Sequence, residues 1–225
     1  MIYDTLKKRK FVRRYDSTVV IPQSLIDALL RKAWEVTPSK NNFMPYTVHV
    51  IGQDQQKYKE LVYLNCLGNE GRTDGIDKAA LDARYAEYPP NYSNILNCSY
   101  LLVFTMRLET SPSWSQQSLI NRGHKYEAVD ESKLNSLYSV TSFEVGLFAD
   151  AFGGMCVEHD LDVSCIGCFK KDVETWTDIP FVTRKPIMLM TVGKGEYYLD
   201  DERKQSGHED RDYRPSYERI VNFVK

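Results

Sequence analysis

The sequence predicts an α+β fold of the three-layer kind, and three observations support this prediction. Segments with apolar residues at helical spacing lie between segments with the short patterns of strands. Long polar insertions separate these segments, as in folds whose helices flank a sheet. The chain has 225 residues, of which 42% are hydrophobic and 27% are charged, so it has the composition of a folded protein with one large domain or two small ones.

The first helix is expected over residues 22–34, where apolar residues recur every three to four positions. Pro22 suits the first turn, and Pro38 forces Thr37 out of helical geometry, so the helix ends before that point. The remaining expected elements, in chain order, are a loop at 38–42, an alternating strand at 46–52, a helix at 54–67, a buried strand at 100–106, the longest helix at 139–159, a strand at 163–169, a helical turn at 172–177 and a central strand at 186–193.

Three stretches carry no clear core pattern. Residues 68–93 are rich in Gly, Asn, Asp, Pro and Tyr and are expected to be irregular, apart from a helical piece at 79–85. Residues 111–135 are polar, and such a stretch is often a lid over a site. After Gly195 the chain is a charged tail.

Composition and charge exclude several classes of protein. A net charge of −2 gives no global field to attract nucleic acid. The clearest apolar runs, at 100–104 and 187–190, are far shorter than the ~18 residues of a membrane span. The basic N-terminus lacks the apolar stretch of a signal peptide, and the scattered cysteines suit a reducing compartment. We therefore expect a cytoplasmic protein without nucleic-acid or membrane partners.

Six cations lie within residues 7–14. Three interpretations are open: a solvated helix end, a nucleic-acid or nuclear-import patch, and a site for a ligand phosphate held by arginine forks and lysine charges. Composition alone favours the first interpretation. The order of motifs along the chain favours the third.

Two motifs near the N-terminus follow one another at a definite spacing. The first comprises Arg9, Lys10, Arg13 and Tyr15. The second comprises Pro38, Ser39, Asn42, Pro45 and Tyr46. Together they resemble the R-R-S-x-R-x-F/Y and A-x-x-A-P-S-x-x-N-x-Q-P-W motifs of the nitroreductase family of flavin enzymes.

Downstream segments extend the resemblance. Residues 160–169, DLDVSCIGCF, are similar to the family's G-L-G-x-x-W-I-G-G-F and keep Ile166, Gly167 and Phe169. The C-terminal YRPSYERIVNFV is similar to the family's R-x-P-x-x-x-I-V ending. Residues 68–135 carry little of the resemblance.

The resemblance implies a nitroreductase-like three-layer fold, with a central and mostly antiparallel sheet flanked by helices, in an intertwined homodimer. Residues 1–225 would form one FMN-binding domain, with a variable lid-like insertion at about 68–135 and a C-terminal arm at about 196–225 that wraps the partner. The long helix at 139–159 would lie in the dimer interface, where its small residues allow close packing.

Members of this family take hydride from NADH or NADPH and pass electrons to nitroaromatic, quinone or similar acceptors in two half-reactions. By resemblance, Arg9, Lys10 and Arg13 would hold the FMN phosphate, because guanidinium forks match its oxygens. By the same resemblance, Arg214 would be a further phosphate ligand and Arg211 a weaker candidate.

The resemblance also places a set of residues at the flavin ring. Ser39 and Asn42 would belong to a loop there, and the Asn42 amide can both donate and accept hydrogen bonds. The other residues placed beside the flavin are Asn69 from the partner chain, Ile166, Gly167 and Cys168, of which the last two would offer main-chain N–H groups near N5 or O4. No side chain needs to act as nucleophile or base, since the cofactor performs the hydride transfer.

The sequence departs from the family motifs at four positions. Phe11 replaces a serine that donates to phosphate, and Met44 replaces a glutamine near the ring. Cys165 and Cys168 stand where the family has Trp and the second Gly. These departures keep two alternatives open: another flavin reaction on the same scaffold, such as reductive dehalogenation or flavin fragmentation, and a non-catalytic homologue that has lost flavin.

Other constellations receive less support. Cys165 and Cys168 have C-x-x-C spacing, but a thioredoxin-like dithiol lies at a helix N-terminus and this pair is expected at a strand end. A zinc site needs four ligands and no second C-x-x-C exists. The four histidines are dispersed without a Ser or Cys partner nearby in sequence, so neither a metal site nor a hydrolase triad is predicted.

Overall fold

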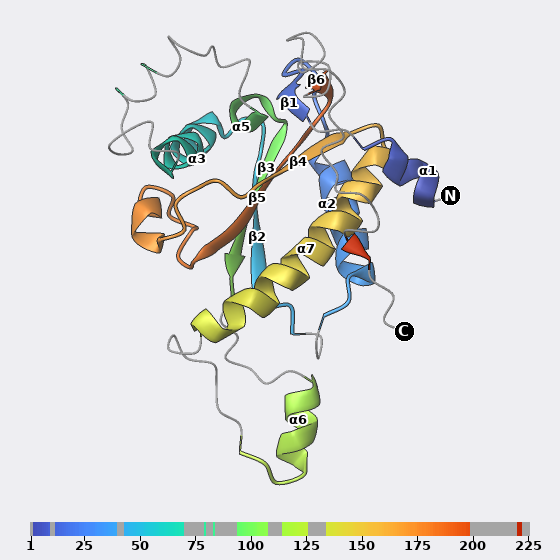
Figure 1. Ribbon diagram of the computed structural model, residues 1–225, viewed down its shortest axis with the longest axis vertical. Coiled ribbons are helices and arrows are strands. Elements are labelled where there is room, and N and C mark those ends of the chain that lie inside the picture. Colours follow the sequence, from blue (N-terminus) through green and yellow to red (C-terminus); the bar gives the residue numbers. More distant parts are fainter. Residues whose placement is uncertain are drawn as a thin grey trace.

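The computed structural model describes residues 2–9, 12–39, 43–69, 79, 83, 94–107, 114–125, 134–198 and 220–221. Its elements in chain order (Figure 1) are α1 (Ile2–Lys7), β1 (Val12–Tyr15), α2 (Gln23–Val36), β2 (Tyr46–Ile51), α3 (Gln56–Asn69), α5 (Asn94–Asn97), β3 (Tyr100–Met106), α6 (Trp114–Asn121), α7 (Leu134–Glu158), β4 (Asp162–Ile166), the 3-10 turn η4 (Val173–Trp176), β5 (Pro186–Gly193) and β6 (Gly195–Tyr198).

The main sheet has four strands in the order β2-β3-β5-β4, and each neighbouring pair is antiparallel. In its centre Leu102 of β3 pairs with Val50 on one side and with Met190 on the other. A second, two-stranded antiparallel sheet joins β1 to β6. The predicted α+β fold with a mostly antiparallel sheet flanked by helices is therefore confirmed.

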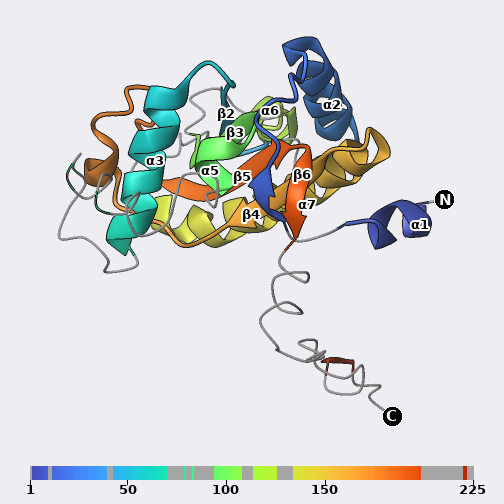
Figure 2. The same ribbon diagram turned by 90° about the horizontal axis from the view of Figure 1, so that it is seen from above.

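Helices cover both faces of the main sheet (Figure 2), which gives the predicted three layers. Side chains of β3 alternate between the two cores: Leu102 and Phe104 pack towards α2 and α7, whereas Leu101 and Val103 pack towards α3 and Trp176 of η4. This alternation explains why the β3 sequence is apolar on both faces, since a strand covered on both sides has no polar face.

Two predictions about the elements were wrong. The stretch after Gly195 was expected to lack a core pattern, yet residues 195–198 form β6, whose Glu196 lies 3.1 Å from Arg14 Nε of β1. Both strands are four residues long and charged, so neither shows a hydrophobic signal of its own. The strand expected at 163–169 ends at Ile166, three residues early.

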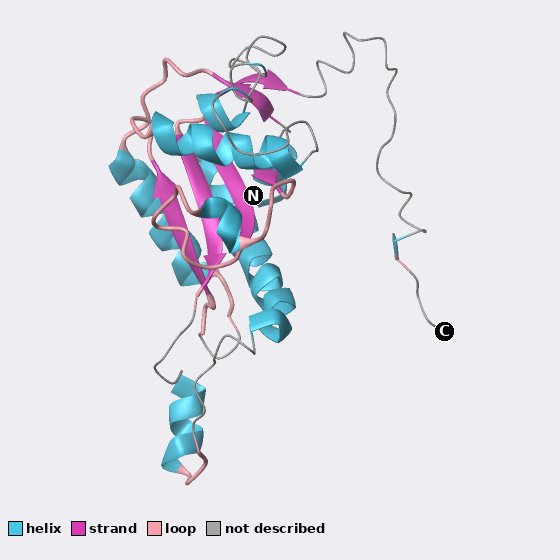
Figure 3. Cartoon of the chain, turned by 90° about the vertical axis from the view of Figure 1, so that its left-hand side faces the viewer, coloured by secondary structure: helices cyan, strands magenta, loops and turns pink. Residues whose placement is uncertain are grey.

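The expected insertion at 68–135 contains elements of two kinds. Helix α5 and strand β3 belong to the core, with Ile95 and Leu96 buried. Helix α6 lies apart from the sheet (Figure 3) in the polar stretch that the sequence left unassigned. The helical piece expected at 79–85 lies almost wholly outside the described residues, since only 79 and 83 are described, both as helical.

Helix α7 is the longest element and begins five residues before its predicted start. Val145, Phe148, Phe152 and Cys156 form its buried stripe against the sheet. Its segment Leu137–Glu158 also has the length and hydropathy of a membrane-crossing helix, a test that core helices pass as well. The buried stripe shows that α7 packs as a core helix.

Acid should weaken the fold through His49 on β2. The His49 Nε2 lies 2.9 Å from Thr105 Oγ1 of β3, and burial lowers the pKa of His49 below its ordinary 6.5. Between the lowered pKa and 6.5 the unfolded chain binds more protons than the folded chain, so stability falls as the pH drops through this window. In denaturant unfolding, His49→Gln should show a smaller loss of stability than wild type between about pH 7 and pH 5. The same loss in both proteins would contradict this assignment.

Candidate functional site

Arg9 follows α1 and lies across the C-terminal half of α7. Its Nη1 donates to Asp150 Oδ1 at 2.5 Å, and its Nη2 donates to the Asp150 carbonyl at 2.5 Å. Gly154 of α7 permits this approach, because a Cβ there would stand 3.3 Å from Arg9 Nη2, tighter than ordinary contact, and Gly153 lies beside the same atom, at 3.6 Å from its Cβ position. The guanidinium is therefore held against the helix by the carboxylate and the carbonyl of Asp150, a residue that the sequence analysis did not single out.

The end of β4 comes to the same place. Desolvation raises the pKa of the Cys165 thiol, and the nearby Arg9 guanidinium opposes that rise. Because β4 ends at Ile166, Gly167 and Cys168 lie in the exposed coil beyond the strand. No described neighbour lies within 4 Å of the position that a Cβ on Gly167 would take. Two segments more than 150 residues apart in the sequence thus meet beside α7.

The loop after α2 reaches α7 about one and a half turns earlier along that helix. Ser39 Oγ donates a hydrogen bond to Glu144 Oε2 at 2.7 Å. Ser39 Oγ also accepts a hydrogen bond from the Met44 N–H at 2.8 Å. Glu144 is only 3% exposed. Both hydrogen bonds of the Ser39 hydroxyl are therefore made within the protein, and one of them joins Ser39 to Met44 near the other end of the loop.

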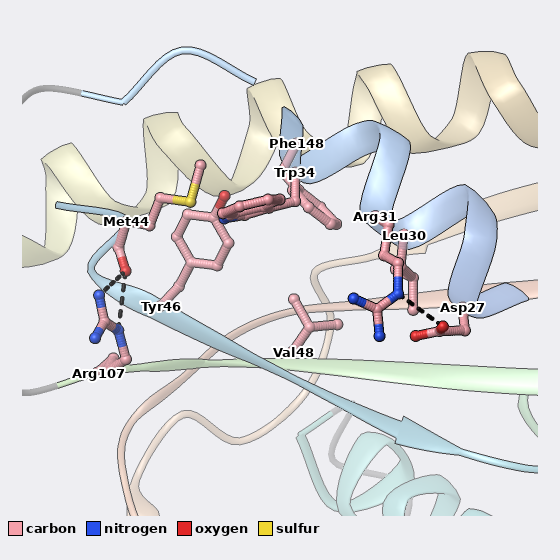
Figure 4. A pocket seen from close by; sticks show the side chains of 9 residues that line it. All are labelled: Asp27, Leu30, Arg31, Trp34, Met44, Tyr46, Val48, Arg107 and Phe148. Carbon is pink, nitrogen blue, oxygen red and sulfur yellow. Dashed lines mark hydrogen bonds and ion pairs between the residues drawn. The ribbon is translucent and has the colours of Figure 1, made fainter. Parts of the chain in front are cut away.

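A pocket of about 580 Å³ adjoins this loop (Figure 4). The residues that line it are Asp27, Leu30, Arg31, Trp34, Met44, Tyr46, Val48, Arg107 and Phe148. At one end Arg107 donates to the carbonyl of Met44, and at the other Arg31 Nε donates to Asp27 Oδ2 at 2.8 Å. Burial raises the pKa of Tyr46 to about 12, with Glu144 adding to the rise and Arg107 opposing it. The Tyr46 hydroxyl is thus close to both charges.

The other predicted site residues are placed as follows. Arg13 is exposed in β1, and Asn69 is the last residue of α3. The predicted site residues that lie outside the described part of the chain are Lys10, Phe11, Asn42, Arg211 and Arg214. The structure therefore brings Arg9 close to β4, since Arg9 Nη2 and Val163 Cγ2 both lie within 3.6 Å of the Cβ position at Gly153, and the predicted convergence with the C-terminal arginines stays a prediction.

Three residues of this region were missed by the sequence analysis: Asp150, Glu144 and Arg107. A signal for the first two was present, because they are the only acidic residues of α7 before its last residue, within an otherwise apolar helix. Arg107 carried no such signal, since it simply follows a strand. In the described part of the chain, no group of three or more His, Cys, Asp or Glu side chains could hold a metal ion.

The surroundings of Arg9 fit a ligand phosphate such as that of FMN. Arg9 Nε is buried and has no hydrogen-bond partner among the described residues, and an arginine offers five N–H donors, of which Asp150 occupies two. Asp150 opposes an incoming anion, but its side chain is 66% exposed and such a pair contributes only about 0–1 kcal/mol. The exposed backbone at Gly167, just after β4, offers accessible N–H groups of the kind that bind a ligand edge.

Known protein families and solved structures include proteins that are similar to this chain. The model of the nitroreductase family matches residues 6–194. A nitroreductase-like protein from Streptococcus mutans has a similar structure, with a TM-score of 0.62, 20% identity and full coverage of both chains. A candidate NAD(P)H:FMN oxidoreductase from Staphylococcus epidermidis gives a TM-score of 0.62 and 16% identity over 100% of this chain and 96% of its own.

A third similar structure is a candidate nitroreductase from Exiguobacterium sibiricum, solved in complex with FMN. Its TM-score is 0.61 at 15% identity, over 100% of this chain and 97% of that one. A search of curated protein sequences gives no match. At these identities the structural similarity supports the fold, and the family match supplies the classification.

Proposed function

The chain belongs to the nitroreductase family, and from this premise we propose that it is an FMN-dependent oxidoreductase that takes hydride from NADH or NADPH and reduces a nitroaromatic, quinone or similar small acceptor. The S. epidermidis and E. sibiricum proteins, one named for FMN and NAD(P)H and one holding FMN, support this proposal.

One observation carries the proposal: Arg9 Nη2 and Val163 Cγ2 of β4 meet at Gly153 of α7, where they lie 3.6 Å and 3.2 Å from the position that a Cβ would take. The family motifs assign the first of these segments to the flavin phosphate and the second to the flavin ring. Their proximity is what a single cofactor spanning both would require, since charge-assisted bonds from a guanidinium suit a phosphate at one end. Asp150 occupies two of the five N–H donors of Arg9, so three, including the Nε that has no described partner, are left for it.

In this proposal the chain binds and orients, and FMN when bound supplies the hydride-accepting chemistry. Arg9 would hold the phosphate, together with Lys10, Arg13, Arg211 and Arg214. The main-chain N–H groups of Gly167 and Cys168 would donate to the ring edge, because they lie in the exposed coil beyond β4. The loop with Ser39 and Asn42 would border the ring, with Asn69 from the partner.

We also propose that the protein is a cytoplasmic homodimer. Phe143 of α7 is 67% exposed, which is unusual for so large an apolar side chain in the middle of a core helix. Gly146, one turn on, has no described atom within 4 Å of the Cβ position, so another backbone could approach closely there. Trp34 and Val36 on the neighbouring α2 are also exposed, at 59% and 60%. An exposed apolar face of this kind suits a subunit interface.

A homologue without flavin is the second candidate, favoured by the bonds that already tie Arg9 to Asp150. Anaerobic oxidation of NADH and of NADPH, with and without added FMN and with one nitroaromatic and one quinone acceptor, separates the two. The proposed enzyme should oxidise at least one nicotinamide in an FMN-dependent way. Rates unaffected by FMN would favour the flavin-free homologue.

A further inference from the structure

The loop between α2 and β2 holds an unfavourable backbone conformation. Met44 has a φ of 42°, in the left-handed region that non-glycine residues rarely adopt. Its carbonyl accepts a hydrogen bond from the Tyr46 N–H at 2.8 Å, which makes a tight turn into β2. A conformation of this kind persists where surrounding contacts fix it. The described part of the loop, Ser39 and residues 43–45, shows two such sets of contacts.

The first set comes from α7. Glu144 accepts the Ser39 hydroxyl proton at 2.7 Å, and Ser39 Oγ accepts the Met44 N–H at 2.8 Å. A carboxylate that is 3% exposed would be costly without hydrogen bonds, so the contact to Ser39 helps to satisfy it. These two consecutive hydrogen bonds connect Glu144 of α7 to Ser39 and Ser39 to Met44. Helix α7 therefore holds both Ser39 and the strained Met44 in place.

The second set comes from the residue that follows β3. Arg107 Nη2 donates to the Phe43 carbonyl at 2.5 Å and to the Met44 carbonyl at 2.9 Å, and Arg107 Nε donates to the Met44 carbonyl at 3.1 Å (Figure 4). The Arg107 N–H donates to the Pro45 carbonyl at 2.9 Å. Three successive carbonyls of the loop therefore point at one half-buried arginine.

We propose that Glu144 and Arg107 are positioning residues that hold Ser39 and residues 43–45 in the shape that borders the flavin. This inference rests on the proposed function, in which that loop borders the flavin ring. Neither residue belongs to the family motifs of the sequence. A loop that is already ordered before the ligand arrives loses less conformational entropy on binding, so the two contacts raise affinity without touching the ligand.

The test uses the full-length protein with two readouts: FMN affinity by titration, and hydrogen exchange at the Met44 amide without FMN. Glu144→Ala should speed exchange at Met44 and weaken FMN binding about 10- to 100-fold, the size expected for losing a hydrogen bond to a charged group. Glu144→Gln keeps an oxygen that accepts from Ser39, so it should restore both readouts to within about threefold of wild type. Glu158→Ala, an exposed glutamate of the same helix, is the control and should change neither.

Arg107→Met keeps the length and apolar stem of the side chain and gives an independent route if Glu144→Ala does not fold. It should also speed exchange at Met44 and weaken FMN binding. Wild-type affinity and wild-type exchange in a folded Glu144→Ala or Arg107→Met would overturn the positioning role while leaving the proposed function intact. Failure of the wild-type protein to bind FMN would overturn the proposed function and this role with it.

Discussion

Arg9→Ala should weaken FMN binding by about 100-fold, because it removes two charge-assisted hydrogen bonds of about 1.5 kcal/mol each. The effect on the fold should be small, since the pair with Asp150 is partly exposed, at 29% and 66%, and such pairs contribute about 0–1 kcal/mol. Titration with FMN, followed by flavin fluorescence, measures the affinity, and thermal unfolding measures the stability.

Three companion variants sharpen this prediction. Arg9→Lys keeps the charge but loses the fork, so its affinity should be intermediate. Asp150→Asn removes the competing carboxylate and should leave FMN binding equal to or tighter than that of wild type. Lys32→Ala removes an exposed cation of α2 that does not line the pocket, and it should leave affinity unchanged. Equal FMN affinity in Arg9→Ala and wild type would show that Arg9 serves only its ion pair.

Gly193→Ala should destabilise the fold by about 3 kcal/mol, at the upper end of overpacking effects. The added Cβ would stand 2.7 Å from Cδ1 and 3.1 Å from Cγ of Tyr15. Tyr15 cannot easily move aside, since it is 2% exposed and its hydroxyl lies 2.9 Å from Thr191 Oγ1. The Ser99 N–H, 3.3 Å away, closes the other side.

Thermal unfolding should show a midpoint lower by roughly 6–12 °C for a domain of this size. Gly52→Ala is the matched control, because Gly52 directly follows β2 as Gly193 ends β5, but its new Cβ would be close only to the flexible end of Asp54, at 3.0 Å. In a Tyr15→Ala background, Gly193→Ala should lower the free energy of unfolding by much less, because the ring that the new Cβ would meet is gone. The same loss in both backgrounds would show that the ring of Tyr15 is not the obstacle.

The sequence predicted best those elements whose signals are local. Strands β3 and β5 were predicted at their observed bounds, because both are apolar runs covered by helices on the two faces. Helix α2 was framed by Pro22 and Pro38. By contrast β1 and β6 are short and charged, and they are held by pairing between residues some 180 positions apart, which no local pattern reveals.

The same distinction applies to the site. The motifs identified Arg9 and the segment 160–169, and the structure places Arg9 close to Val163 of that segment, across Gly153 of α7. The partners of the site residues could not be predicted, because the contacts of Arg9 with Asp150, and of Ser39 with Glu144, depend on how α7 lies against distant loops. That arrangement is a property of the packed fold rather than of any motif.

The central claim is that this chain holds FMN, and the visible absorption spectrum of the purified protein tests it most directly. After incubation with FMN and removal of free flavin by gel filtration, we expect flavin bands that correspond to about one FMN per chain, and a band intensity that falls sharply in Arg9→Ala. A colourless protein after this treatment, with the wild-type chain folded, would contradict the account.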